Sequence, residues 1–297
     1  MPTQAGCGNL DRRQGGRRRA RDLVGNLGQA GGRRRRPRRL RAARPRLRRC
    51  DPHPDLPLNG LLGRPLEIRF TGKIACVACG RAVKRTFGEG LCFPCSQSRA
   101  DADICMFKPE LCHHGDAAAP CRDEAFARTQ CFQPHVLYAS LTSDPKVGIT
   151  RKVNVPVRWL DQGAVRAVPL AELPSRREVG LLEHELAGRH ADRTHWMAML
   201  KLAEPEPEDD FDGFVAAILA ELAALGVAPP APPDRAERRF RYPVLRHPAK
   251  VVSFNLDRDP VAGGVLDGIK GQYLIFDQGV INARKYAGYR VVLSEQP

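Results

Sequence analysis

Two pairs of cysteines stand at a spacing that suits a bound metal ion. Cys76 and Cys79 form one C-x-x-C turn, and Cys92 and Cys95 form a second one after twelve intervening residues. Each turn places two thiolates together, and a hairpin between the turns would bring both pairs into one tetrahedral site. The pattern predicts a zinc ribbon, in which zinc stabilises the fold. Disulfides are the weaker alternative in a cytosolic chain.

Four more cysteines follow within 27 residues, with histidines among them. They are Cys105, Cys112, Cys121 and Cys131. Their segment is polar and broken by Pro and Gly, so it is a poor candidate for a core of its own, and the cysteines suggest a second metal. Zinc is favoured, which makes one or two zinc ions in all, but four cysteines also suit an iron–sulfur cluster. Free buried cysteines are the alternative.

The elements that would position further chemistry begin at Val136. Two β-prone runs, Val136–Leu141 and Lys146–Thr150, are joined by a Ser-Asp-Pro turn, which predicts a β-hairpin. A helix should follow, with Asn154 as its N-cap, Pro156 in its first turn and Gly163 at its end.

The pairs Leu137-Tyr138 and Val147-Gly148, followed by Arg158 on the expected helix, resemble the hairpin and first helix of GIY-YIG nucleases. In that family a Tyr and an Arg surround the scissile phosphate, and a Glu on a later helix holds a divalent metal. The resemblance implies that Tyr138 orients or deprotonates water, Arg158 offsets phosphate charge, and Glu183 holds Mg²⁺. Lys146 departs from the family by standing where its second Tyr would be.

A wider resemblance covers the chain from about Leu56 to its C-terminus. The sequence is similar to an uncharacterised prokaryotic family, domain of unknown function 2797, which implies no established activity. The matching motifs are Gly90–Cys95, Lys108–His113, Cys121-Arg122, Pro134–Tyr138, Lys146–Arg151, Arg158–Gly163 and Gly268–Leu274.

Beyond the hairpin, a third strand is expected from Ala164 to Leu170, then a helix from Ser175 to about Ala187. Glu183 should lie on or beside the apolar face of that helix, either as a metal ligand or as half of a structural ion pair. An amphipathic helix ending at Gly226 comes next.

The last part of the chain alternates like strands. The expected strands are Lys250–Leu256, Val265–Phe276 and Tyr289–Leu293, forming a small antiparallel sheet or half-barrel. Basic and aromatic side chains on these strands suit either a surface that binds single-stranded nucleic acid or an ordinary solvated face.

The net charge of +15 lies in the first 50 residues, which hold seventeen Arg and two Asp; the rest carries 31 basic and 31 acidic side chains. The basic stretch is therefore either an arm for nucleic acid or acidic partners, or a disordered and even spurious extension. No apolar run is long enough for a membrane span and no secretory signal is evident, so we expect no membrane partner and a cytoplasmic location.

Together these patterns predict an α+β protein with a zinc-ribbon-like segment, a GIY-YIG-like sheet and a C-terminal β subdomain. The predicted function is a zinc-stabilised, nucleic-acid-associated protein with a potential Mg²⁺-dependent nuclease or phosphodiesterase activity; the alternative is a non-catalytic nucleic-acid-binding or adaptor protein. The expected divisions are a tail (1–55), a Cys-rich region (56–132), the GIY-YIG-like module (133–203), a helix and linker (204–239) and the β subdomain (240–297).

Overall fold

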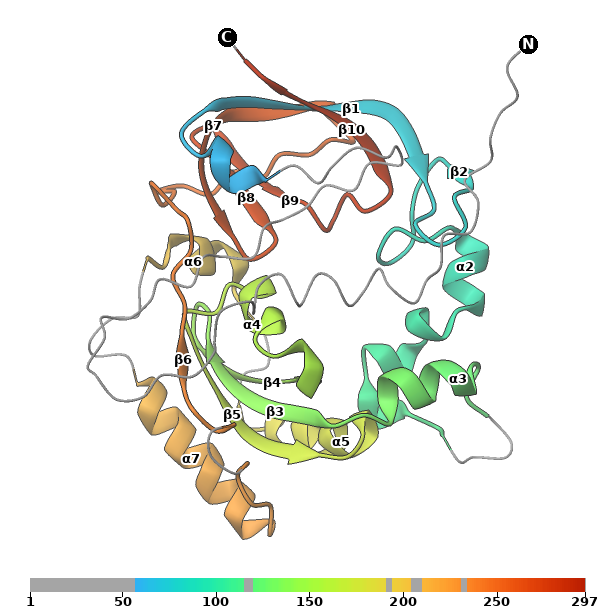
Figure 1. Cartoon of the computed structure of the whole chain (residues 1–297), viewed down its shortest axis with the longest axis vertical. Helices are drawn as coiled ribbons and strands as arrows, with labels where there is room; N and C mark the ends of the chain where they lie inside the picture. The colour runs from blue at the N-terminus through green and yellow to red at the C-terminus, as the bar shows by residue number, and fades with distance from the viewer. Residues whose placement is uncertain (1–56, 115–119, 191–193, 204–209, 231–233, 297) are drawn as a thin grey trace.

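The computed structural model describes residues 57–114, 120–190, 194–203, 210–230 and 234–296. This part of the chain forms two antiparallel sheets with helices against the smaller one (Figure 1), which confirms the α+β prediction. The Arg-rich tail predicted for residues 1–55 lies outside the described residues.

The larger sheet combines strands from both ends of the described chain. Its order is β10-β1-β7-β8-β9, and β2 pairs with the far end of β1. The strands are β1 (Pro65–Ala75), β2 (Ala82–Val83), β7 (Val261–Lys270), β8 (Tyr273–Phe276), β9 (Gly279–Asn282) and β10 (Tyr289–Glu295). The register between β1 and β10 shifts between Phe70 and Ile74, around Gly72 with its positive φ of 76°. A bulge of this kind bends a strand and increases its twist, and the sheet is accordingly curled, as predicted (Figure 1).

Two expected strands of this sheet are wrong. Val265–Phe276 is not one strand, because the chain turns back at Gly271, which has a positive φ of 58°, and forms the antiparallel pair β7 and β8. Lys250–Leu256 is irregular apart from a single bridge between Ser253 and Val280. Its alternating apolar side chains led to the prediction, but Phe254 only packs beside the core of the sheet. The side chain of Asn255 accepts a hydrogen bond from the amide of Asp257, so a turn ends the segment there.

The smaller sheet has the order β4-β3-β5-β6, with all pairs antiparallel. Its strands are β3 (His135–Leu141), β4 (Pro145–Arg151), β5 (Arg166–Leu173) and β6 (Arg238–Arg239). The predicted hairpin is therefore present, and its first strand is the buried centre of the sheet. The β3–β5 register shifts between Leu137 and Tyr138, beside Pro169, which has no N–H to give to the ladder.

Helices cover both faces of this sheet. Leu137 and Ala139 share a core with α5 (Arg176–Ala187) and α7 (Phe211–Ala224), whereas Tyr138 packs with Trp159 of α4 (Val157–Asp161). Because side chains alternate along a strand, α4 and α5 lie on opposite faces (Figure 1). The larger sheet is joined to this layer through α6 (Trp196–Lys201), whose Met199 packs with Tyr273.

Two helix starts test the predictions. Ser175 caps α5 as expected, since its hydroxyl accepts a hydrogen bond from the Glu178 amide. The predicted N-cap of α4 at Asn154 is wrong, because α4 begins only after Pro156. The residue before a proline is driven to extended backbone, as Val155 is here, so the helix cannot start earlier.

The cysteine-rich segment runs between the two sheets as short turns and helices. They are α2 (Phe93–Ser98), α3 (Glu124–Phe126), a π-helical turn (Ala127–Cys131) and 3-10 turns at Ala100–Ala102, Ile104–Met106 and Pro109–Leu111. Two more 3-10 turns lie outside this segment, at Leu58–Leu61 before β1 and at Lys152–Asn154 after β4. Ile104, Phe107, Leu111 and Phe132 are exposed, so this segment buries little apolar surface of its own.

Candidate metal centre and basic site

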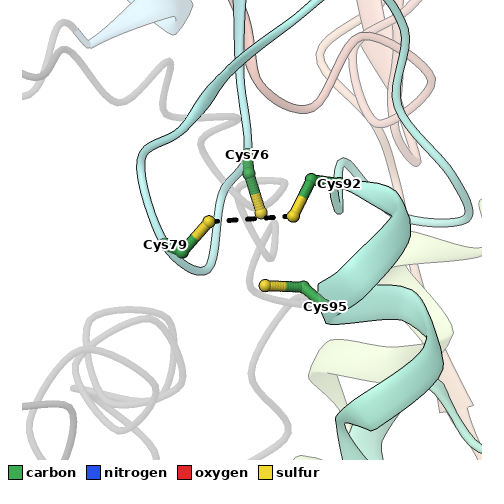
Figure 2. A group of neighbouring side chains, drawn as sticks. All are labelled: Cys76, Cys79, Cys92 and Cys95. Atoms are coloured by element: carbon green, nitrogen blue, oxygen red, sulfur yellow. Dashed lines mark hydrogen bonds between the residues drawn. The ribbon is translucent and has the colours of Figure 1, made fainter.

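The first four cysteines come together at the point where the chain leaves β1. Cys76 directly follows the strand, Cys79 lies in the turn after it, and Cys92 and Cys95 stand at the start of α2. The potential ligand atoms of all four lie within 4.8 Å of one another. Figure 2 shows the sulfur atoms turned toward a common point. A group of four thiolates this close suits a tetrahedral metal such as zinc.

Local backbone contacts fix this arrangement. The amide of Gly80 donates to the carbonyl of Cys76, closing the first turn with Gly80 at a φ of 74°. The amide of Val77 donates to Gly90, which ties the first turn to the approach of the second. A Cβ at Gly90 would lie 2.8 Å from the Ala287 carbonyl oxygen, so the turn packs directly against the larger sheet's last loop.

The electrostatics of the four thiols favour a bound cation. Burial raises the pKa of Cys76, but hydrogen bonds from the backbone of Cys79, Cys92 and Ala78 outweigh it and lower the pKa to about 6. The pKa of Cys95 rises to about 12, chiefly through its hydrogen bond with Cys92. Neighbouring thiols cannot all ionise alone because each thiolate disfavours the next, and a cation removes that penalty.

The second four cysteines line one cavity of about 30 Å³, together with His113 and His114. Burial, together with the smaller effects of the nearby Asp103 and the other three thiols, raises the pKa of Cys105 to about 11. In the part of the chain that the structure describes, the first set is the one group of His, Cys, Asp or Glu side chains close enough together to hold a metal ion, and the second set does not form such a group.

Tyr138 lies at the centre of the hairpin, opposite Gly148 in the neighbouring strand. A Cβ at Gly148 would lie 2.8 Å from the Tyr138 hydroxyl, so the ring lies over this glycine. The hydroxyl donates to Gln162 Oε1 at 2.8 Å, and only 1% of the residue is exposed. Lys146, at the family's second Tyr position, is also buried.

Arg158 and Glu183 reach Tyr138 from different helices. The pKa of Tyr138 is raised to about 12, chiefly by burial. The positive charge of Arg158 and a hydrogen bond with its side chain oppose the rise, and the charge of Glu183 adds to it. The three residues named by the GIY-YIG resemblance are thus electrostatically coupled. With its pKa raised in this way, the Tyr138 phenol stays neutral near pH 7.

Two further arginines belong to this basic site, which we define as Tyr138, Arg151, Arg158, Arg176 and Glu183. Burial lowers the pKa of Arg176; Cys131, Glu183 and Cys105 oppose the shift, and the charge of Arg158 adds a smaller lowering effect. The pKa of Arg151 is likewise lowered by burial and then by Arg176.

The buried His135 completes the surroundings of the basic site. Its Nδ1 lies 2.6 Å from the Gln133 carbonyl, and burial lowers its pKa to about 4. Sequence reasoning missed Arg151 and Arg176. Arg151 ends the Lys146–Arg151 motif, but Arg176 follows an ordinary N-cap and carries no signal of its own.

Arg176 is held by the cysteine-rich segment. Its Nη2 donates to the Met106 carbonyl at 2.6 Å, and its Nε lies 3.5 Å from the Cys105 carbonyl. On the same helix, a Cβ at Gly180 would lie 2.1 Å from Pro109 Cβ, so α5 and the Pro109–Leu111 turn are in direct contact. The segment that carries the second cysteine set therefore contacts α5, the helix that carries Arg176 and Glu183 of the basic site.

Comparisons with known proteins place the chain in a family. No curated protein and no solved structure gives a significant match. No helix among the described residues has the length and apolar character needed to cross a bilayer. The model of the family described as "Protein of unknown function (DUF2797)" matches residues 63–291, a range that includes both cysteine sets and the whole basic site. The chain therefore belongs to the DUF2797 family.

Proposed function

We propose that this protein is zinc-stabilised and binds the phosphates of a nucleic acid through a GIY-YIG-like module. The order of the elements supports the module: hairpin β3–β4, helix α4, strand β5 and helix α5, with β3 between β4 and β5 in the sheet. Zinc is the metal that best suits four thiolates at the first site, because it prefers tetrahedral sulfur ligation and structural zinc sites are closed by four protein ligands.

The observation that carries the binding proposal is a set of neighbouring charges on partly buried surface: Arg158 and Glu183 act on both Tyr138 and Arg176, and Arg151 lies close to Arg176. Guanidinium groups repel one another when they are partly removed from water, and a bound anion offsets that repulsion. Arginine also matches phosphate oxygens with two donors at once. A local cationic site of this kind can bind phosphate even though the folded part of the chain is formally neutral.

A second candidate function is Mg²⁺-dependent phosphodiester cleavage at the same site. The coupling of Arg158 and Glu183 to Tyr138 favours it: Glu183 would hold the metal, Arg158 would offset phosphate charge, and Tyr138 would orient water. We rank phosphate binding above cleavage because Tyr138 is almost fully buried and its hydroxyl already donates a hydrogen bond to Gln162. If binding occurs without cleavage, the protein is a nucleic-acid-binding or adaptor protein.

Binding to labelled DNA and RNA by the full chain tests the proposal. Arg158→Ala and Arg176→Ala should weaken binding and reduce the slope of log K against log salt by about 1 each, if each arginine contacts one phosphate. The matched control is Arg177→Ala, an exposed arginine beside Arg176 on the same helix, which should bind like the unmodified chain. Absence of binding by the unmodified chain at low salt would overturn the proposal.

The same samples separate binding from catalysis. Incubation with Mg²⁺ should give cleavage products that disappear in Glu183→Gln if the site is catalytic. Intact nucleic acid in the presence of Mg²⁺ and Mn²⁺, with binding retained, would reject the phosphodiesterase and leave the binding function.

A further inference from the structure

We propose that Cys105, Cys112, Cys121 and Cys131 bind a second thiolate-ligated metal centre, and that this centre holds Arg176 in place. The first part of this proposal, that the four cysteines bind a metal, is argued from the geometry of the cysteine-rich segment. The second part, that the metal positions Arg176, affects activity only if the proposed nucleic-acid function is correct.

The first observation is the convergence of the four thiols on one cavity from four separate places. Cys105 lies in the Ile104–Met106 turn, Cys112 directly follows the Pro109–Leu111 turn, Cys121 precedes α3, and Cys131 ends the π-helical turn. The cavity volume of about 30 Å³ exceeds the roughly 10–15 Å³ that one water-sized group needs. Four thiolates around such a space select zinc or an iron–sulfur centre over harder metals.

The second observation is that little else holds this segment together. Between residues 100 and 132, in the described part, Asp103, Pro109 and Ala127 are the buried residues, while several large apolar side chains remain exposed. Hydrophobic burial is therefore small, and its turns are too short to be stable alone. A metal that joins four points of such a segment supplies folding free energy directly.

The third observation is the contact of this segment with α5. The carbonyls of Cys105 and Met106 accept hydrogen bonds from Arg176, and Pro109 fills the space over Gly180. Cys105 itself takes part in these contacts, and Cys112 follows Pro109 by three residues. A metal bound to both would fix the turn against α5, and would thereby keep the Arg176 guanidinium directed at the basic site.

The two candidate metals share this chemistry and differ in spacing. A cluster places iron and sulfide between its thiolates, so its four ligands stand farther apart than those of a single zinc. The ligand atoms of the first set all lie within 4.8 Å of one another, whereas the second set does not form a closed group of this kind. Iron and acid-labile sulfide in the purified chain distinguish a cluster from a second zinc.

The decisive measurement is the metal content of the unmodified full chain, purified without oxygen or chelators. We expect either two zinc ions per chain, or one zinc together with iron, acid-labile sulfide and visible charge-transfer absorption. One zinc per chain and no other metal would overturn the proposal. This measurement needs no variant, and its result does not depend on whether the protein binds nucleic acid.

Matched variants assign each metal to its site. Cys112→Ser should lose the second centre and keep the first, whereas Cys79→Ser should lose the first and keep the second. Cys112→Ser should also exchange its amide hydrogens at residues 104–111 and in the first turn of α5 at least tenfold faster than the unmodified chain. A full metal complement in Cys112→Ser, or unchanged exchange at these residues after the metal is lost, would refute the corresponding half of the proposal.

Discussion

The contact between Gly180 and Pro109 leads to a sharp prediction for Gly180→Ala. A methyl group at this position would lie 2.1 Å from Pro109 Cβ and 2.9 Å from its Cγ. Carbon atoms attract best at about 3.5–4.0 Å, so the turn and the helix must separate by more than 1 Å. Overpacking of this kind costs about 1–3 kcal/mol, and the better helix propensity of Ala returns up to about 1 kcal/mol.

The matched control is Gly188→Ala, the same substitution at the end of the same helix. Gly188 has a φ of −64°, and its new Cβ would lie 3.5 Å from the Glu185 carbonyl oxygen, which is an ordinary contact. This variant should be stabilised by about 0.4–1 kcal/mol, because the unfolded chain loses freedom. We expect Gly180→Ala to be less stable than Gly188→Ala by about 1–3 kcal/mol, the cost of the clash.

Two assays measure this difference in stability. Urea denaturation in metal-replete buffer compares the stabilities of the two variants. Hydrogen exchange reports whether the loss is local, since protection should fall at residues 104–111 and in α5 but not in the larger sheet. Equal stability of the two variants, or loss of protection in the larger sheet alone, would refute the view that α5 is clamped by the Pro109–Leu111 turn.

Three further predictions concern other parts of the structure. Cys92→Ser should remove the first metal and lower the melting temperature, which metal analysis and thermal unfolding measure. Chelation of the unmodified chain removes every bound metal and should lower the melting temperature at least as far. Gly148→Ala places a methyl group 2.8 Å from the Tyr138 ring and should destabilise the chain by about 1–3 kcal/mol in chemical denaturation; a stability equal to that of the unmodified chain would contradict this close packing. Burial lowers the pKa of Lys270 to about 7 from its ordinary 10.5, so between these pH values the unfolded chain holds a proton that the folded chain lacks. The unfolding free energy should therefore rise by up to about 1.4 kcal/mol per pH unit across this window, and Lys270→Met should lack that component of the rise.

Local patterns made much of the fold predictable. The hairpin is specified by β-prone runs on both sides of an Asp-Pro turn, and α5 is specified by Ser175 with Glu178 three residues later. The first cysteine set was predictable because a C-x-x-C turn fixes the two sulfurs within a few residues. In each of these cases the physical cause lies inside a short window of sequence.

The features that the sequence did not reveal depend on distant contacts. The burial of Tyr138 depends on its packing against Trp159 and on its hydrogen bond to Gln162, more than twenty residues away. Arg176 enters the basic site because two carbonyls, seventy and seventy-one residues earlier, hold its side chain. The irregular Lys250–Leu256 segment alternates like a strand, but apart from one bridge to Val280 the sheet gives it no extended neighbour to pair with.

The positions of the cysteines follow from the path of the chain. The larger sheet takes β1 from the start of the described chain and β7–β10 from its end, so the cysteine-rich segment and the smaller sheet are inserted between them. The first set begins at Cys76, where the chain leaves β1, and the second ends at Cys131, shortly before it enters β3. Between these points neither sheet's core covers the chain, and thiolate–metal bonds can fix a segment that apolar burial does not. That segment also supplies the two carbonyls that accept hydrogen bonds from Arg176. A well-ordered segment therefore fixes where the Arg176 guanidinium points. Loss of the proposed second metal should therefore weaken the proposed phosphate binding before it unfolds either sheet.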